Sequence, residues 1–293
     1  NIPSKNEVAF LRASAAQRVR SVVSLLAILL LIVSLISTAG WFLTHQSPDP
    51  TRVTNLQDND RPGSLRYAID EAPPKSTITF NANLRGTILL TTGNLIIAKD
   101  LTLRGSGEGI LSISSGKSGH IIRVIQGITV TIFGLTFKDS NNSTSVTGFI
   151  DNQGTLTLSN STVSDNTASS SGGSYDTKGE LTLSNSSGGG GIFNEGTLML
   201  DNSTVSDNTA IGGGGIFNSG TLTLSNSTVS GNTAIGGGGI ANFGTLMLSN
   251  STISDNTSSF GAGGGIYNQG TLTLSNSTVS NNTAGVGGGI LSE

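Results

Sequence analysis

Residues 212–234 read GGGGIFNSGTLTLSNSTVSGNTA, and variants of this stretch recur along the second half of the 293-residue chain. The repeated block begins at six glycines: Gly154, Gly179, Gly196, Gly220, Gly244 and Gly270. These glycines are 25, 17, 24, 24 and 26 residues apart, and the short interval lacks the part of the block that would follow Ser186. A period of roughly 20–50 residues indicates a repeat architecture and argues against a flexible linker.

Three short apolar stretches recur in each repeat. Leucines lie two and four residues after the leading glycine, as in Leu222 and Leu224, with mostly threonine between them. This period of two is typical of a strand with one buried face. Ile216, four residues before a leading glycine, and Val229, nine residues after it, represent two further strands. A unit of about 24 residues cannot bury these faces alone, whereas stacked units can.

The repeat therefore predicts an all-β fold, a right-handed parallel β-helix of about nine coils and about 40 Å in length at the strand spacing of a sheet. Asparagines recur two residues before the leading glycine and six and twelve residues after it, as in Asn218, Asn226 and Asn232. We expect them to lie at bends and to form amide ladders between coils. Some begin N-x-S/T sequons, but their repetition favours bends over glycosylation. We expect the glycine runs to supply bends with positive φ.

Composition excludes several classes of protein. The 41 glycines are about twice the usual share, but they lack the period of collagen. The absence of cysteine excludes disulfides and cysteine-ligated metals. Residues 124–293 carry ten acidic and two basic side chains, a formal charge of −8, so nucleic acid is not an expected partner.

An apolar segment precedes the repeats. Residues 21–43 contain no charged side chain and would form a helix of about 35 Å, enough to cross a hydrocarbon core of about 30 Å. Basic residues precede it, so residues 1–20 are expected in the cytoplasm and the remainder outside. A signal peptide cleaved after Ala39, behind Ser37 and Thr38, is the alternative. Both interpretations predict a cell-surface or extracellular protein, anchored by one transmembrane segment or secreted after cleavage.

The stretch between the apolar segment and the repeats is expected to cap the solenoid. Ser64 suits the N-cap of a short helix that ends before Pro73. The apolar face of this helix would consist of Leu65, Ala68, Ile69 and Ala72. A cap is needed because the first coil otherwise exposes apolar side chains and unpaired strands. The predicted parts of the chain are 1–20, the helix 21–43, a linker 44–51, the cap 52–75 and the β-helix 76–293, with regular repeats from about residue 150.

Two motifs carry a resemblance to known proteins. The GGGI and FxN elements of residues 213–218, with the block that follows them, resemble the repeat of bacterial right-handed parallel β-helix proteins of the pectate-lyase-like superfamily, and are similar to those of polymorphic outer-membrane proteins. Residues 63–68, GSLRYA, resemble the N-terminal segment named for its C-S-L-R-E-A motif, although the cysteine and the glutamate are replaced. The resemblance covers about residues 52–290, and it implies the fold but no particular activity.

No catalytic, cofactor-binding or metal-binding residue is predicted. The two histidines, His45 and His120, lack a nucleophile and an orienting group at a recognisable spacing. Asp165, Asp207 and Asp255 recur eleven residues after a leading glycine and are expected to form an acidic stripe on the surface. Glycoside hydrolysis instead needs two carboxyl groups that face one bond.

A row of aromatic residues is expected on the strand before each leading glycine. Phe193, Phe217 and Tyr267 occupy this position, and Ala241 interrupts the row. Stacking that stabilises the coils is the favoured interpretation, and a contact surface is the alternative.

Three functions remain open. The favoured one is adhesion or scaffolding at the cell surface without catalysis, with a surface polysaccharide or another cell-surface protein as the partner. The alternative is a polysaccharide lyase or glycoside hydrolase, which is an analogy from fold alone. The minor alternative is ice binding through the outward Thr-x-Thr pairs, such as Thr221 and Thr223, although threonine is also the ordinary choice for an exposed strand.

Overall fold

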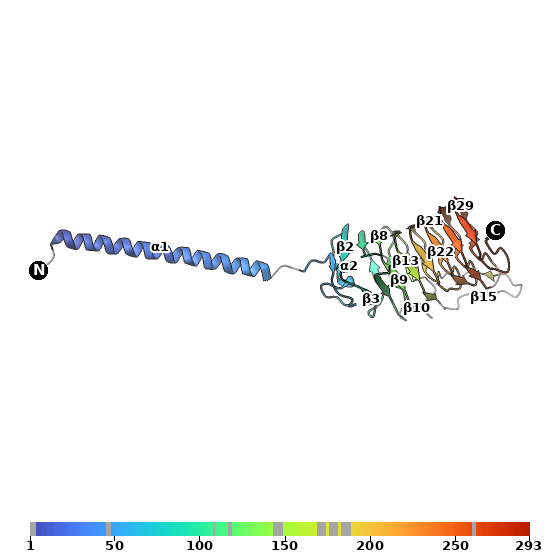
Figure 1. Cartoon of the computed structure of the whole chain (residues 1–293), viewed down its shortest axis with the longest axis horizontal. Helices are drawn as coiled ribbons and strands as arrows, with labels where there is room; N and C mark the ends of the chain where they lie inside the picture. Colours follow the sequence, from blue (N-terminus) through green and yellow to red (C-terminus); the bar gives the residue numbers. More distant parts are fainter. Residues whose placement is uncertain are drawn as a thin grey trace. The chain divides into compact units, whose positions relative to one another are not determined.

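The computed structural model describes residues 4–44, 48–107, 109–116, 119–142, 149–168, 174–175, 181–182, 189–259 and 262–293. The chain forms two separate units, Asn1–Pro48 and Asp49–Glu293 (Figure 1). The first unit is helical, and the second is a parallel β-solenoid.

The first unit consists of one long helix, α1 (Lys5–Thr44). The most apolar part of its Lys5–Ile36 portion has a mean hydropathy of 2.7, and by length and composition this portion is able to cross a membrane. The helix begins well before residue 21 because residues 13–20, ASAAQRVR, are mostly good helix formers. It fits both the anchor and the signal-peptide interpretation. The side chains at 37–39, where cleavage was considered, and His45 lie outside the described residues.

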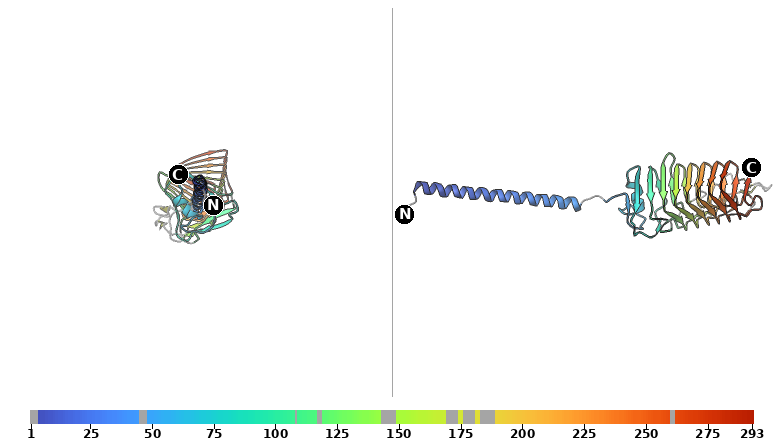
Figure 2. Two further views of the ribbon diagram at one scale, coloured as in Figure 1. Left: turned by 90° about the vertical axis from the view of Figure 1, so that its left-hand side faces the viewer. Right: turned by 45° about the horizontal axis from the view of Figure 1, so that its top comes forward.

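Three parallel sheets run along the solenoid, and their strands lie side by side in sequence order (Figure 2). Sheet A contains β1 (Arg52–Val53), β2 (Ser76–Phe80), β5 (Leu101–Arg104), β8 (Thr129–Phe133), β12 (Thr155–Ser159), β18 (Thr197–Asp201), β21 (Thr221–Ser225), β25 (Thr245–Ser249) and β29 (Thr271–Ser275). Sheet B contains β3 (Gly86–Leu89), β6 (Leu111–Ser114), β9 (Thr136–Lys138), β13 (Thr162–Ser164), β19 (Thr204–Ser206), β22 (Thr228–Ser230), β26 (Thr252–Ser254) and β30 (Thr278–Ser280). Sheet C contains β4 (Leu95–Ile97), β7 (Ile122–Val124), β11 (Ile150–Asn152), β17 (Ile192–Asn194), β20 (Ile216–Asn218), β24 (Ile240–Asn242), β28 (Ile266–Asn268) and β31 (Ile290–Ser292).

Short two-residue strands complete the described part of the solenoid. They form three pairs: β10 (Asn141–Asn142) with β14 (Thr167–Ala168), β23 (Thr233–Ala234) with β27 (Thr257–Ser258), and β15 (Ser174–Tyr175) with β16 (Leu181–Thr182). The first two pairs are parallel, and the third is antiparallel.

The leucines that follow the leading glycines form columns inside sheet A. Leu222 lies opposite Leu198 of the preceding coil and Leu246 of the following coil, and all three are fully buried. Ile216 and Val229 stack in the same way in sheets C and B. Full burial of one such side chain stabilises the fold by about 1.5–3 kcal/mol, so these columns supply the core. The predicted parallel solenoid is confirmed.

The described part of the block that begins at Gly179 adds no strand to sheets A, B or C, contrary to the prediction. β12 pairs directly with β18, so Leu156 lies opposite Leu198, 42 residues later. Tyr175 and Leu181, which were expected in the columns, pair with each other in the antiparallel β15–β16 instead. The reason is that this block lacks the second strand of the repeat, without which a turn of the solenoid cannot close. The solenoid therefore has about eight coils, against about nine expected.

The glycine runs are required by contact between coils, and positive φ is the exception among them. Gly263 and Gly287 have positive φ, whereas Gly214 does not. A Cβ on Gly214 would overlap the carbonyl oxygen of Gly238 in the next coil. The leading glycines behave alike, since a Cβ on Gly196 would overlap the carbonyl oxygen of Gly154. The predicted role of these runs as left-handed bends is therefore wrong for most positions.

Left-handed bends occur at two other positions of the repeat. The asparagines six residues after the leading glycine, such as Asn226, have φ near +50°, as predicted. The residues eleven after it have φ of similar sign and size, +56° at Asp207 and +66° at Gly231. Aspartate, asparagine and glycine are the residues that adopt this geometry most readily. The positive φ at this position therefore explains why aspartate, asparagine and glycine occur there along the acidic stripe.

The asparagines two residues before and twelve residues after the leading glycine form two ladders, and all the members except the terminal Asn282 are buried. Asn152, Asn194, Asn218, Asn242 and Asn268 donate from Nδ2 to the next member, or finally to Ser292, at 2.7–3.0 Å. Asn166, Asn208, Asn232, Asn256 and Asn282 form the second ladder, with links of 2.9–3.0 Å. Amide ladders were predicted, and the structure confirms them for these two positions. Their burial means that every missing link leaves a polar atom without a partner.

The N-terminal end of the solenoid is closed by β1 and α2 (Leu65–Glu71). The Ser64 hydroxyl accepts the backbone N–H of Tyr67 at 3.1 Å, which is the predicted N-cap. The buried residues of this helix and of its C-terminal cap are those predicted: Leu65, Ala68, Ile69 and Ala72.

Candidate functional site

Sheet A has a regular outer surface over its five regular coils. Its outward side chains come from β12, β18, β21, β25 and β29, and strand pairing places them in three columns. The first column is Thr155, Thr197, Thr221, Thr245 and Thr271; the second is Thr157, Met199, Thr223, Met247 and Thr273; the third is Ser159, Asp201, Ser225, Ser249 and Ser275. We call these fifteen residues the hydroxyl face. The predicted Thr-x-Thr array exists, with methionine at alternate coils.

The hydroxyl face carries almost no charge. Asp201 is its one charged residue, and it has neither lysine nor arginine. Met199 and Met247 are the most apolar side chains on it, and they are 44% and 39% exposed. The surface therefore offers hydroxyl groups and two apolar side chains to a partner.

A shallow depression lies at the N-terminal end of the first two columns. It has a volume of about 310 Å³ and is lined by Lys75, Asp100, Leu101, Thr102, Thr129 and Thr131. Thr129 and Thr131 pair with Thr155 and Thr157, so they continue the columns of the hydroxyl face. The N–H of Thr129 donates to Oδ1 of Asp100 at 2.8 Å. The depression thus adds one cation and one anion at the end of the hydroxyl face.

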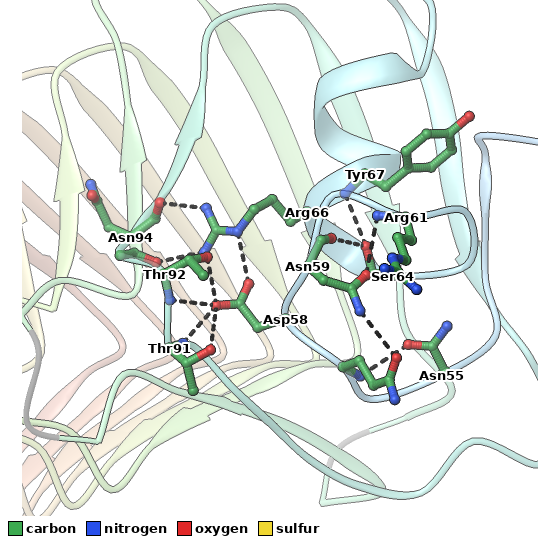
Figure 3. Close-up of polar contacts among 12 residues, drawn as sticks. Asn55, Asp58, Asn59, Arg61, Ser64, Arg66, Tyr67, Thr91, Thr92 and Asn94 are labelled. Carbon is green, nitrogen blue, oxygen red and sulfur yellow. Dashed lines mark hydrogen bonds and ion pairs between the residues drawn. The ribbon is translucent and has the colours of Figure 1, made fainter.

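The motif at residues 63–68 serves the cap (Figure 3). Nε of Arg66 donates to Oδ1 of Asp58 at 2.8 Å, and the Asp58 side chain is only 1% exposed. Oδ2 of Asp58 accepts the backbone N–H groups of Thr91 and Thr92 at 2.6 and 2.9 Å. Arg66 also donates to the carbonyl oxygen of Gly93 at 2.6 Å. The pair therefore fastens the cap to the loop that precedes β4.

The environment of Asp58 keeps its carboxylate ionised. Burial, the largest single influence, would raise its pKa, but the hydrogen bonds from the Arg66 guanidinium and from the two threonines outweigh burial, so the pKa lies below its usual value. All of these groups belong to the cap or to its neighbouring loop. The arginine that carries the C-S-L-R-E-A resemblance thus has a structural role.

A second buried carboxyl group lies on the outer side of sheet C. Asp151 is 3% exposed, and its Oδ2 is 3.1 Å from Nε of the half-buried Arg123. Oδ1 of Asp151 has no hydrogen-bond partner. Burial outweighs the positive charges of Arg123 and His120 and raises the pKa of Asp151. His120 therefore lies within electrostatic range of a carboxylate, which its sequence position did not reveal.

The acidic stripe lies on exposed bends. Asp165, Asp207 and Asp255 are exposed, and each has φ near +55°. Gly231 takes the corresponding place between the second and third of them. The prediction of a surface stripe is confirmed. Within the described parts of the chain, no three histidine, aspartate or glutamate residues are placed to hold a metal ion.

The aromatic row is continuous, contrary to the expected interruption at Ala241. The ring of Phe217 lies 5.4 Å from that of Phe193 and 5.0 Å from that of Phe243, and Phe243 lies 5.9 Å from Tyr267. Phe243 follows the ladder asparagine and fills the space above Ala241. The sequence contained a sign of this continuity. Phenylalanine precedes the ladder asparagine in one coil, as Phe217, and follows it in the next, as Phe243. Phe193 and Phe217 are 6% and 7% exposed, which supports the stacking interpretation.

Comparisons with known proteins add no family. No family model matches the chain, and no curated protein matches it. Among solved structures, the chain is similar to the crystal structure of pectate lyase Pel9A, with 14% identity and a TM-score of 0.42. The similarity covers 82% of this chain and 72% of that chain. The fold assignment rests on the strand pairing described above, and the chain is a parallel β-solenoid with an N-terminal apolar helix.

Proposed function

We propose that this chain is an exported β-solenoid that acts in adhesion or scaffolding at the cell surface and catalyses no reaction. It is anchored by α1 or secreted after removal of that helix. The observation that carries the proposal is the hydroxyl face, a surface that repeats similar chemistry over five coils in register. Such a surface suits a partner that is itself extended and repetitive.

The roles of the polar side chains support this proposal. The buried asparagines link one coil to the next, as in the bond from Asn218 to Asn242. Asp58 and Arg66 hold the cap. Asp207 and its equivalents form bends. These polar side chains are thus engaged in maintaining the fold.

The proposal is tested with the full chain in detergent micelles. Binding of the chain to the surface of the cells that produce it is compared between the wild type and Thr157→Glu/Thr223→Glu, which places two charges on the hydroxyl face. Thr204→Glu/Thr228→Glu is the matched control, because these threonines are equally half-buried on sheet B. We expect the first variant to lose binding and the control to keep it.

The same preparation tests the competing functions. Release of reducing or unsaturated ends from a panel of polysaccharides, abolished by alanine at one carboxylate, would establish an enzyme and overturn the proposal. Thermal hysteresis that is lost in the hydroxyl-face variant would establish ice binding. The proposal expects neither activity.

A further inference from the structure

We infer that the hydroxyl face binds a neutral β-(1→4)-linked polysaccharide, with the sugar chain running along the axis of the solenoid. This inference rests on the proposed function and names the class of partner for it. Three features of the face carry it: its charge, the period of its second column, and the depression at its end.

Charge restricts the partner to a neutral polymer. The fifteen residues of the hydroxyl face include a single carboxylate, Asp201, and no cation. A polyanion such as a polyuronate needs cations to hold it, and a polycation needs several carboxylates. Hydroxyl groups both donate and accept hydrogen bonds, as do the hydroxyl groups of a sugar. The face therefore matches a neutral polysaccharide better than a charged one.

The second column supplies a period of two coils. It reads Thr157, Met199, Thr223, Met247 and Thr273 along the solenoid. Coils lie about 4.8 Å apart, so methionines recur about every 9.6 Å. Successive rings of an extended β-(1→4)-linked chain have a spacing similar to that between adjacent coils. Each ring is turned by half a revolution relative to the last, so equivalent rings recur every second coil. Each coil would thus lie under one ring, and the two methionines would meet equivalent rings.

Methionine suits the contact that this register requires. A sugar ring presents an apolar patch of C–H groups, and the flexible, polarizable thioether side chain packs against irregular apolar surfaces. Met199 and Met247, the two apolar side chains of the face, are 44% and 39% exposed. A β-(1→3)-linked glucan does not keep this register, because its rings follow a helical path.

The depression provides a place for one end of the sugar chain. Its Thr129 and Thr131 continue the first two columns, so a chain that follows those columns reaches Lys75 and Asp100. Among the described residues, neither Nζ of Lys75 nor Oδ2 of Asp100 has a hydrogen-bond partner. Both atoms are therefore available to sugar hydroxyl groups.

The test measures co-sedimentation of the full chain, in detergent micelles, with four insoluble or immobilised polymers. Microcrystalline cellulose and β-mannan are the neutral β-(1→4)-linked probes, β-(1→3)-glucan is neutral with the wrong linkage, and polygalacturonate is the polyanion. The variant Met199→Thr/Met247→Thr makes the second column uniform, and it is expected to fold because threonine occupies the same column in neighbouring coils. Thr228→Ala/Thr252→Ala on sheet B is the control.

We expect binding to at least one β-(1→4)-linked probe, which the methionine variant weakens by about tenfold or more, equivalent to about 1.4 kcal/mol. The control variant should bind as the wild type does. Equal binding of the methionine variant, equal binding to β-(1→3)-glucan, or preference for polygalacturonate would each overturn the inference. Failure to bind any of the four polymers, together with persistent binding to cells, would overturn it and leave the proposed function intact. Cleavage of a polymer would overturn the proposed function itself.

Discussion

The exchange of aromatic positions between β20 and β24 provides a test of how the coils hold together. In β20, Phe217 precedes the ladder asparagine and Ser219 follows it; in the next coil, Ala241 precedes the asparagine and Phe243 follows it. Phe243 stacks on Phe217 at 5.0 Å and contacts Tyr267 at 5.9 Å. Replacing Phe243 with serine removes both contacts.

The magnitude follows from these two contacts and the burial of the ring. Each aromatic pair contributes about 0.5–1.5 kcal/mol beyond the apolar area it buries. Phe243 is half-buried, so the loss stays below the about 3–5 kcal/mol typical of truncating a fully buried phenylalanine. We expect Phe243→Ser to lower the free energy of unfolding by about 2–3 kcal/mol.

The double variant Ala241→Phe/Phe243→Ser is expected to recover most of this loss. It reproduces the arrangement of the preceding coil, and position 241 is in register with Phe217 and Tyr267. The assay is urea unfolding followed by circular dichroism. Glu195→Ser is the control, because it makes the same change to serine at the corresponding, exposed position of another coil. An unchanged stability of Phe243→Ser, or no recovery in the double variant, would refute the proposed stacking.

Three further predictions concern the ladders, the buried carboxyl groups and the leading glycines. Asn218→Ala should cost about 3 kcal/mol in urea unfolding, more than Asn268→Ala, because it leaves the deeply buried Asn242 acceptor unpartnered in mid-ladder. Asp58→Asn should destabilise the protein at neutral pH, with a deficit that shrinks as the pH falls below about 4, because the pKa of Asp58 is lowered by folding. For Asp151→Asn, the stability of the variant relative to the wild type should decrease as the pH falls. The raised pKa of Asp151 makes the wild type more stable at lower pH, and asparagine does not titrate. Gly196→Ala should prevent or severely weaken folding, as judged by circular dichroism, because its Cβ would overlap the preceding coil.

The regular coils were predictable because each carries the same local pattern. Leu222 and Leu224 specify a strand by alternation alone, and repetition then places them on the equivalent leucines of neighbouring coils. The prediction of a coil at the Gly179 block was wrong. The sequence of this block matches one strand of the repeat, but its 17-residue interval is too short for a full turn of the solenoid. A segment forms a coil only if it contributes a strand to each of the three sheets. A match to one strand of the repeat does not show that the other two are present.

The depression and the two carboxyl groups were not predictable from the repeat. Lys75 and Asp100 lie in early coils that have diverged from the consensus, so no periodic signal brings them together. Asp58 contacts residues 33 and 34 positions later, a separation that no local pattern reports. The close contact that requires the glycine runs was likewise not predicted. Whether a Cβ fits there depends on the distance between adjacent coils, and the sequence does not give that distance.

The three sides of the solenoid are not equivalent as binding surfaces, and strand length is one cause. The regular strands of sheet A have five residues, whereas those of sheets B and C have three. At about 3.3 Å per residue, sheet A is about 16 Å wide and the other two are about 10 Å wide. The outer side of sheet C is also occupied, since Phe193 and Phe217 stack there and are nearly buried. The hydroxyl face is therefore the side with both the width and the exposed side chains to hold an extended polymer, and substitutions there should affect binding more than equivalent substitutions on sheet B.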